Sequence, residues 1–122
     1  MILCDTNILI EFYKNNQSIT DELHIIRAEN LAISVVTAAE LYYGAFNKVE
    51  LQEIQKHLAI LYQYPLTVTI SRKFLDLMGM YTLSHGLSLP DALIAATAVT
   101  HNIKLYTLNL KDFRYIPNLK LY

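Results

Sequence analysis

Short apolar runs alternate along the chain with longer segments of helical spacing, and this alternation is what most constrains the fold. The run at residues 1–4 ends at Asp5 and is typical of a fully buried strand. Comparable runs occupy 31–36, 65–70 and 103–108, and a short edge strand is expected at 118–122. The segments between them place apolar residues three and four positions apart, which predicts helices over 6–16, 18–30, 37–46, 49–63, 71–86 and 89–102.

Strands that alternate with helices favour a parallel sheet covered on both faces. We therefore predict an α/β fold, a three-layer α/β/α domain with a central, mostly parallel sheet of four to five strands. Ser18 is the expected N-cap of the second helix, and Gly86 is the expected terminator of the fifth. Pro90 lies near the start of the sixth helix, where its missing N–H does no harm.

The composition indicates one compact domain over residues 1–122. Hydrophobic residues make up 53% of the 122 and charged residues 17%, which suits a folded chain with one core and excludes a disordered one. Cys4 is the only cysteine, so no internal disulfide can form, and a reducing compartment is expected. No leader is recognisable, and no apolar run approaches the roughly 20 residues of a membrane span. We expect a cytoplasmic protein without membrane contact.

The charge balance excludes nucleic-acid binding by a global basic excess, because the formal net charge is −1. A local patch, a metal ion or a partner would have to supply positive charge. The last stretch holds basic residues with Asp112 as its only acid: Lys104, Lys111, Arg114 and Lys120. The four histidines are scattered, so a zinc site is weakly supported, and no glycine-rich phosphate loop occurs.

Three acids lie in apolar surroundings near a strand end or a helix start: Asp5, Glu40 and Asp91. Each has a structural explanation, because Asp5 suits an N-cap, and both Thr37–Glu40 and Ser88–Asp91 fit a capping box. Together they would place several negative charges in one cleft, where they repel unless a cation binds or a proton is taken up. Carboxylates in such a cleft suit Mg²⁺, which prefers oxygen ligands and retains water.

Four stretches, in this order, resemble the motifs of PIN-domain ribonucleases, most closely the VapC-type toxins of type II toxin–antitoxin pairs. They are "CDTNILI", "SVVTAAELYYGA", "LSLPDALIAATA" and "LYTLNLKDF", and the resemblance covers essentially the whole chain. It implies an endoribonuclease dependent on Mg²⁺ or Mn²⁺ that cleaves single-stranded or loop RNA. It also implies a cognate antitoxin that covers the acidic cleft, and a homodimer.

The resemblance assigns the family's first three acids to Asp5, Glu40 and Asp91. Asp5 and Asp91 are expected to bind the metal, and Glu40 to orient water, acting as the base for attack on phosphorus. The fourth acidic position departs from the pattern, since Asn109 stands where many PIN domains carry Asp and Asp112 follows three residues later. Asp112 is taken as the fourth catalytic acid, with supporting roles for Thr6, Asn7, Thr107 and Asn109.

Lys111 and Arg114 are the residues expected to contact RNA phosphates, and Lys104 is a further candidate. Tyr42, Tyr43 and Tyr106 could stack on unpaired bases, although tyrosines at such spacing more often lie in a core or interface. Two alternatives stay open. A catalytically inactive PIN-like module would bind RNA or protein and keep its acids as caps. A phosphoaspartate phosphatase is disfavoured, because Asn7 stands where that class needs a second acid.

Overall fold

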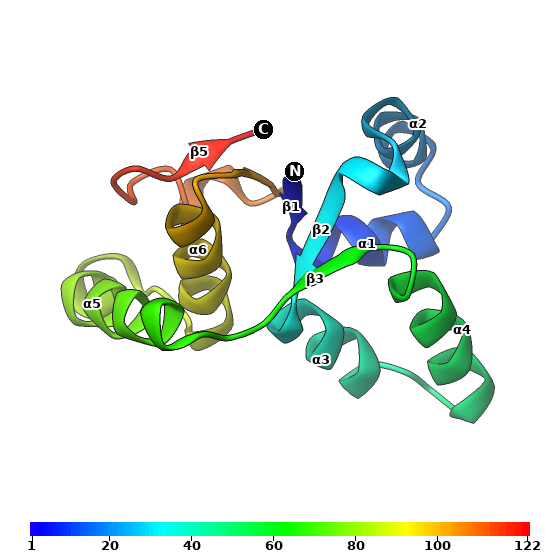
Figure 1. Cartoon of the computed structure of the whole chain (residues 1–122), viewed down its shortest axis with the longest axis horizontal. Coiled ribbons are helices and arrows are strands. Elements are labelled where there is room, and N and C mark those ends of the chain that lie inside the picture. The colour runs from blue at the N-terminus through cyan, green and yellow to red at the C-terminus, as the bar shows by residue number, and fades with distance from the viewer.

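Five parallel strands form the sheet in the computed structural model of the chain, which describes residues 1–122 (Figure 1). Their spatial order is β3-β2-β1-β4-β5, and all four neighbouring pairs are parallel. The strands are β1 (Ile2–Cys4), β2 (Leu31–Ser34), β3 (Tyr62–Tyr64), β4 (Lys104–Tyr106) and β5 (Lys120–Leu121). The predicted sheet is thus confirmed in strand number and direction, including the short edge strand at the end of the chain.

Six helices cover the two faces of this sheet: α1 (Thr6–Tyr13), α2 (Gln17–Ile26), α3 (Val35–Tyr43), α4 (Lys48–Leu58), α5 (Val68–His85) and α6 (Leu89–His101). Short 3-10 turns, η1 and η2, occupy Ala28–Asn30 and Leu110–Asp112. Figure 1 shows α5 and α6 together on one side and α1 to α4 on the other. None of the helices has the length and apolar character needed to cross a membrane.

The core is divided into two layers because successive strand residues point to opposite faces of a sheet. Leu3 and Ala32 pack in the cluster with α5 and α6. Their neighbours Cys4 and Ile33 pack in the other cluster, with α1 to α4. This alternation confirms the three-layer α/β/α prediction and buries both faces of the short central strands.

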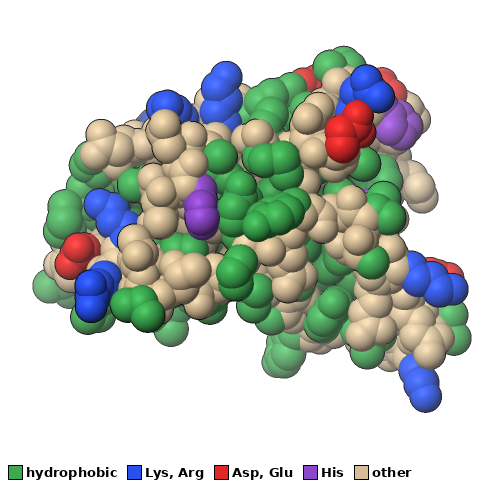
Figure 2. Space-filling model, in the orientation of Figure 1, with side chains coloured by type: hydrophobic (Ala, Val, Ile, Leu, Met, Phe, Trp, Pro, Cys, Tyr) green, Lys and Arg blue, Asp and Glu red, His purple; other side chains and the backbone are tan.

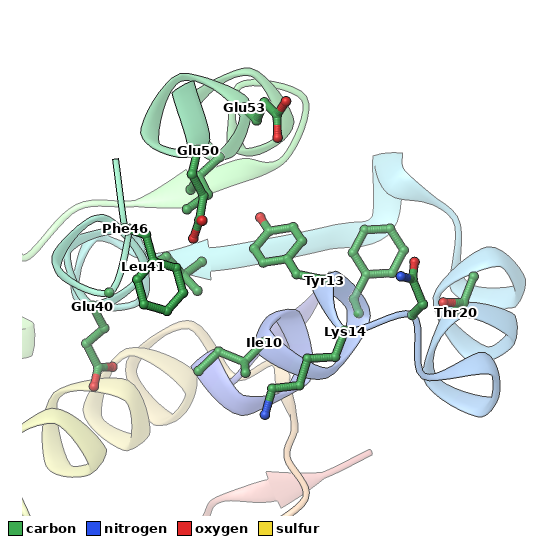
Figure 3. A pocket seen from close by; sticks show the side chains of 13 residues that line it. Ile10, Tyr13, Lys14, Thr20, Glu40, Leu41, Phe46, Glu50 and Glu53 are labelled. Carbon is green, nitrogen blue, oxygen red and sulfur yellow. The ribbon is translucent and has the colours of Figure 1, made fainter. Parts of the chain in front are cut away.

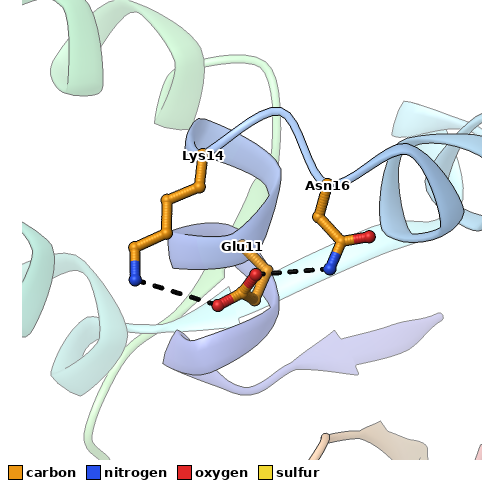
Figure 4. Close-up of polar contacts among 3 residues, drawn as sticks. All are labelled: Glu11, Lys14 and Asn16. Carbon is orange, nitrogen blue, oxygen red and sulfur yellow. Dashed lines mark hydrogen bonds and ion pairs between the residues drawn. The ribbon is translucent and has the colours of Figure 1, made fainter.

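The connection from α1 to α2 corrects the predicted cap of the second helix. Asn16, rather than Ser18, is the N-cap, since its Oδ1 accepts from Ile19 N at 3.4 Å and from Ser18 Oγ at 3.1 Å. The Asn16 amide also donates to Glu11 Oε2 at 3.2 Å, while Lys14 Nζ lies 3.9 Å from Glu11 Oε1 (Figure 4). Asparagine and serine both cap well, so sequence alone did not decide between them.

The predicted strand at 65–70 is wrong. Thr67 caps α5 there, its hydroxyl accepting from Ile70 N at 3.2 Å, and the third strand lies earlier, at Tyr62–Tyr64. The β-branched run Val68–Ile70 favours a strand locally, but the cap starts a helix whose first turn is anchored by the fully buried Ile70. Tyr62 is exposed on the edge strand, so β3 lacks the apolar run of a buried strand.

The segment at 31–36 also divides differently from the prediction. The strand ends at Ser34, whose hydroxyl accepts from Val36 N at 3.1 Å and caps α3. Other predicted ends are confirmed: Gly86 terminates α5 in the left-handed conformation with φ 65°, and Pro90 lies in the first turn of α6 behind the Ser88 cap.

Candidate active site

Asp5 lies at the carboxyl end of the central strand β1, the edge at which open parallel sheets bind ligands. It is also the N-cap of α1, and its side chain is 5% exposed. Oδ1 accepts from Thr6 N at 2.8 Å, and Oδ2 accepts from Thr107 Oγ1 at 2.8 Å. Thr107 directly follows β4, the neighbour of β1, so two adjacent strand ends fix the orientation of this carboxylate.

Burial is the main reason that the pKa of Asp5 is raised above its usual value. The hydrogen bonds from Thr107 and Thr6 lower the pKa, while the charges of Glu40 and Asp112 raise it. The ionised form of Asp5 is therefore held by two hydrogen bonds in a place where burial and like charge oppose it.

Glu40 lies on α3 and does not close a capping box, which corrects one of the structural explanations. The cap of α3 is Ser34, so Thr37 is a buried residue inside the helix. Thr6 Oγ1 donates to Glu40 Oε1 at 2.7 Å and lies 3.1 Å from Thr37 Oγ1. Glu40 is thus tied to the start of α1, beside Asp5, rather than to its own helix end.

Asp91 lies in the first turn of α6, half-buried, and its N–H donates to Ser88 Oγ at 3.3 Å. The predicted cap by Ser88 is confirmed. Burial and the charge of Asp5 raise the pKa of Asp91 to about 6, partly offset by the Ser88 hydrogen bond, and Asp112 and Glu40 raise it further. Asp5, Asp112 and Glu40 are thus the acids whose charges act on Asp91.

The residues that follow β4 are connected to this site through different groups, some by side chains and some by backbone N–H groups. Asp112 is exposed on η2. Asn109 donates its backbone N–H to Thr107 Oγ1 at 3.0 Å, so the threonine hydroxyl relays a hydrogen bond from Asn109 to Asp5. Asn7 Oδ1 accepts from Leu108 N at 3.5 Å, a long contact that links α1 to the same loop. Asn7 and Asn109 thus organise the backbone of the loop beside the acids.

No basic side chain balances this acid cluster, since both ion pairs of the chain lie elsewhere, at Glu11–Lys14 and Arg27–Glu29. No three Asp, Glu, His or Cys side chains converge as a complete set of metal ligands. A hard divalent cation held by one or two carboxylates and water fits such a donor set, whereas a zinc site closed by protein ligands does not. The uncompensated charge of Asp5 and Asp91 is the feature that a cation would stabilise.

A groove of about 760 Å³ lies beside the cluster, between α1, α3 and α4. Figure 3 shows Glu40 at one end, the rings of Tyr13 and Phe46 along it, and Glu50 and Glu53 on α4. Asp5, Asp91 and Asp112 do not line the groove, so Glu40 is the one site acid that borders it. The groove is mainly apolar and adjoins the acids through that single carboxylate.

The basic residues of the last stretch divide between two ends of the sheet. Lys111 and Arg114 are exposed on either side of Asp112. Lys104 and Lys120 are paired at the amino ends of β4 and β5, away from the acids. On the face drawn in Figure 2, basic side chains are scattered around the periphery, with hydrophobic ones toward the centre. Of these four basic residues, only Lys111 and Arg114 lie within two residues of a site acid in the sequence.

The tyrosines singled out from the sequence do not form a common surface. Tyr106 packs against Tyr122 at 5.0 Å between ring centroids, and Tyr43 is 95% exposed on α3.

Thr37 is the site residue whose role the sequence did not predict: it was interpreted only as a cap, yet its hydroxyl contacts that of Thr6. The sequence feature that could have indicated this contact is the spacing of three residues between Thr37 and Glu40, which places both side chains on one face of a helix.

Comparisons with known proteins give a consistent result over nearly the full chain. The model of the PIN domain matches residues 2–119. Ribonuclease VapC10 of Mycobacterium tuberculosis (strain H37Rv) is 38% identical, with 98% of this chain and 91% of the relative covered. A toxin–antitoxin complex from Klebsiella pneumoniae contains a chain with a TM-score of 0.83 at 32% identity, covering 98% of this chain and 95% of that one. VapBC2 from Rickettsia felis, crystallised with a DNA fragment from its promoter, gives 0.79 at 30% identity, covering 100% and 98%.

Proposed function

The chain belongs to the PIN-domain family, and from that premise we propose that it is a VapC-type endoribonuclease, the toxin of a toxin–antitoxin pair. Residues 1–122 would form the single catalytic domain, and the substrate would be single-stranded or loop RNA. The observation that carries the proposal is the meeting of Asp5 and Asp91 at the carboxyl end of β1, with raised pKa values and no basic partner. Such a site is built to hold a cation against a phosphodiester.

Asp5 and Asp91 are the residues that would hold Mg²⁺ or Mn²⁺. When bound, the ion would polarise a phosphate oxygen and neutralise charge at the reacting phosphorus. Thr6 and Thr107 keep the Asp5 carboxylate in one orientation through hydrogen bonds to its two oxygens. Asp112 adds negative charge at the open side of the site, where Asn109 carries none.

Glu40 is proposed as the general base. Its Oε1 is held by the Thr6 hydroxyl, which leaves Oε2 to take a proton from the attacking water. Its side chain is exposed, so water can reach it, and Thr37 supports the hydroxyl that orients it. Lys111 and Arg114 would bind flanking phosphates and offset the charge of the cleft.

An antitoxin segment is the proposed occupant of the groove between α1, α3 and α4. The groove offers about 760 Å³ with an apolar lining, and Glu40 lies at its end (Figure 3). An apolar segment laid along it could place a basic side chain against Glu40 and block the proposed base. We also propose a homodimer, supported by Val68, Leu75 and Leu83, which are exposed along one face of α5.

The test is cleavage of single-stranded RNA with Mg²⁺ or Mn²⁺. Asp5→Asn and Asp91→Asn are each expected to lower the rate by at least a hundredfold, and excess chelator to abolish cleavage. Asp76→Asn, an exposed acid on α5, is the matched control and should cleave normally. Undiminished cleavage by Asp5→Asn and Asp91→Asn would contradict the proposal. RNA binding without cleavage, and without Mn²⁺ affinity, would identify the inactive binding module instead.

A further inference from the structure

Three aromatic side chains outside the proposed catalytic set pack together where α5 ends. The His85 ring lies nearly flat on Tyr115, with ring centroids 3.9 Å apart and planes at 17°. Tyr81 meets both rings edge-on, 5.5 Å from His85 and 5.0 Å from Tyr115. We call these residues, Tyr81, His85 and Tyr115, the aromatic stack.

The aromatic stack borders the acid cluster through two short links of chain. His85 is followed by the Gly86 cap and then by Ser88, which starts the helix that carries Asp91. Tyr115 comes three residues after Asp112. The pKa of Tyr115 is raised by burial, followed by the charges of Asp112 and Asp91. The charges of Asp112 and Asp91, two of the proposed catalytic acids, therefore act on the stack.

His85 is the open member of the stack. Its side chain is exposed, whereas Tyr81 and Tyr115 are partly buried. Because Tyr115 covers one face of the imidazole, the exposed surface lies on the opposite face and the outer edge. Ser84 Oγ lies 2.8 Å from His85 Nδ1 and helps to hold the ring in place. The result is a flat, supported ring surface that exists before any ligand binds.

Positive charge lies on the same segment of chain as Tyr115. Arg114 precedes Tyr115, and Lys111 precedes Asp112, and both basic side chains are exposed. Basic side chains that follow a backbone, interleaved with aromatic rings on which bases stack, are the usual features of single-stranded nucleic-acid binding. A peptide ligand would need hydrogen-bonding edges or an apolar pocket, and the groove described above does not include these residues.

We propose that the exposed face of His85, supported by Tyr115 and Tyr81, is a stacking subsite for one unpaired base of the RNA next to the scissile phosphate. The inference rests on the proposed ribonuclease function and adds a position where the substrate is held. A base stacked there would leave its own phosphates within reach of Lys111 or Arg114. Because every base has a flat face, this subsite fixes the register of the strand rather than its sequence.

The chain supplies a matched control for this proposal. His101 packs on Tyr64 with ring centroids 4.3 Å apart and planes at 33°, and His101 is also exposed. It lies at the last residue of α6, at the opposite end of the helix from Asp91. A His–Tyr pair away from the acids should have no effect on RNA.

The experiment measures affinity for a fluorescent 12-nucleotide single-stranded RNA by anisotropy, with Ca²⁺ in place of Mg²⁺. We expect His85→Ala to weaken binding about 5- to 100-fold, the range of one base–aromatic stack. His85→Phe should retain binding, and His101→Ala should match the wild type. In a series of RNAs with one abasic nucleotide each, a single position should weaken wild-type binding and leave His85→Ala binding unchanged.

A second readout avoids dependence on the stability of the alanine variant. The chain has no tryptophan, so His85→Trp introduces a single fluorophore. Its emission should be quenched by the RNA, and the emission of His101→Trp should not. Wild-type cleavage that requires Asp91, with equal RNA affinity in His85→Ala and His101→Ala, would overturn the subsite and leave the proposed function standing. A wild type with no RNA affinity and no cleavage would overturn both.

Discussion

Asp91 shows most directly how function and stability oppose each other at a single residue. Its carboxylate is half-buried beside Asp5, and its pKa is raised to about 6. Ionisation above that pH costs the folded state free energy, because the unfolded chain ionises the same group near pH 4 without repulsion. An acid that served only the start of α6 would gain nothing from burial beside Asp5.

We therefore predict that Asp91→Asn stabilises the metal-free protein at pH 7.5, by on the order of 1 to 2 kcal/mol after allowance for the exposed part of the side chain. The gain should shrink as the pH falls through 6 and disappear near pH 4, where both states of the wild type are protonated. Thermal unfolding across that range measures it. Added Mg²⁺ should raise the wild-type Tm and leave Asp91→Asn unchanged; equal shifts would speak against a role for Asp91 in metal binding.

Thr107 is predicted to set the acidic limit of activity. Its hydroxyl lowers the pKa of Asp5 by donating to Oδ2, so Thr107→Val should raise that pKa further. The acidic limb of the pH–rate profile should then move upward by about one pH unit, equivalent to about 1.4 kcal/mol. Thr69→Val, an exposed threonine in the first turn of α5, is the control. A profile that keeps its position while the rate falls would assign Thr107 a purely structural role.

At the scale of elements, the site depends on the starts of three helices. Asp5, Ser34 and Ser88 are N-caps, and each of these starts positions one acid or its support. The α5–α6 connection is three residues long and lies between His85, the last residue of α5, and the first turn of α6, which carries Asp91. Gly86 makes its turn possible with φ 65°, which a side chain disfavours.

Two glycines, Gly79 inside α5 and Gly86 at its C-cap, give a prediction with opposite signs. Gly86→Ala should destabilise the protein by about 1 kcal/mol, because alanine is strained at positive φ. Gly79→Ala should stabilise it by about 0.5 to 1 kcal/mol, since Gly79 is inside the helix and an added Cβ would meet nothing within 4 Å. Urea denaturation with unchanged m-values measures both. The same sign for both would mean that Gly86 does not act through its backbone conformation.

At the scale of the whole molecule, RNA binding must overcome a net charge of −1. The double variant Lys111→Gln/Arg114→Gln should reduce the slope of log affinity against log salt concentration by about 1.4. Each phosphate contact to a single strand contributes about 0.7 to this slope, and the variant removes two such contacts. Lys104→Gln/Lys120→Gln, at the other end of the strands, is the matched control and should keep the wild-type slope. Equal slopes in the two double variants would contradict a phosphate-binding role for Lys111 and Arg114.

The oligomeric state is predicted from the exposed apolar face of α5. Light scattering of the protein alone should give twice the 14.0 kDa mass of one chain. With an antitoxin peptide present, it should give this dimer mass plus the mass of the bound peptide. Leu75→Glu/Leu83→Glu should shift the mass to that of the monomer, because buried charges oppose association. A wild-type monomer at micromolar concentration would contradict the dimer.

The sequence by itself determined the layers, the parallel sheet and the number of helices, because hydrophobic period and caps are local properties of the chain. It ran the first four helices three to five residues past their observed ends at Tyr13, Ile26, Tyr43 and Leu58. It also singled out Asp5, Glu40 and Asp91. It misplaced the third strand, since the exposed edge strand Tyr62–Tyr64 carries no apolar run and Val68–Ile70 imitates one. It assigned Thr37 to a cap one turn away from the true cap at Ser34.

Only the tertiary structure decided which groups meet. The pairing of β1 with β4 brings Thr107 to Asp5, 102 residues apart, and the packing of α1 on α3 brings Thr6 to Glu40. The aromatic stack likewise joins His85 to Tyr115. Contacts across such separations depend on how the layers pack, which no local pattern encodes. Local sequence therefore placed the acids on their elements, whereas packing raised the pKa values of Asp5 and Asp91 and left the acids without an ion-pair partner.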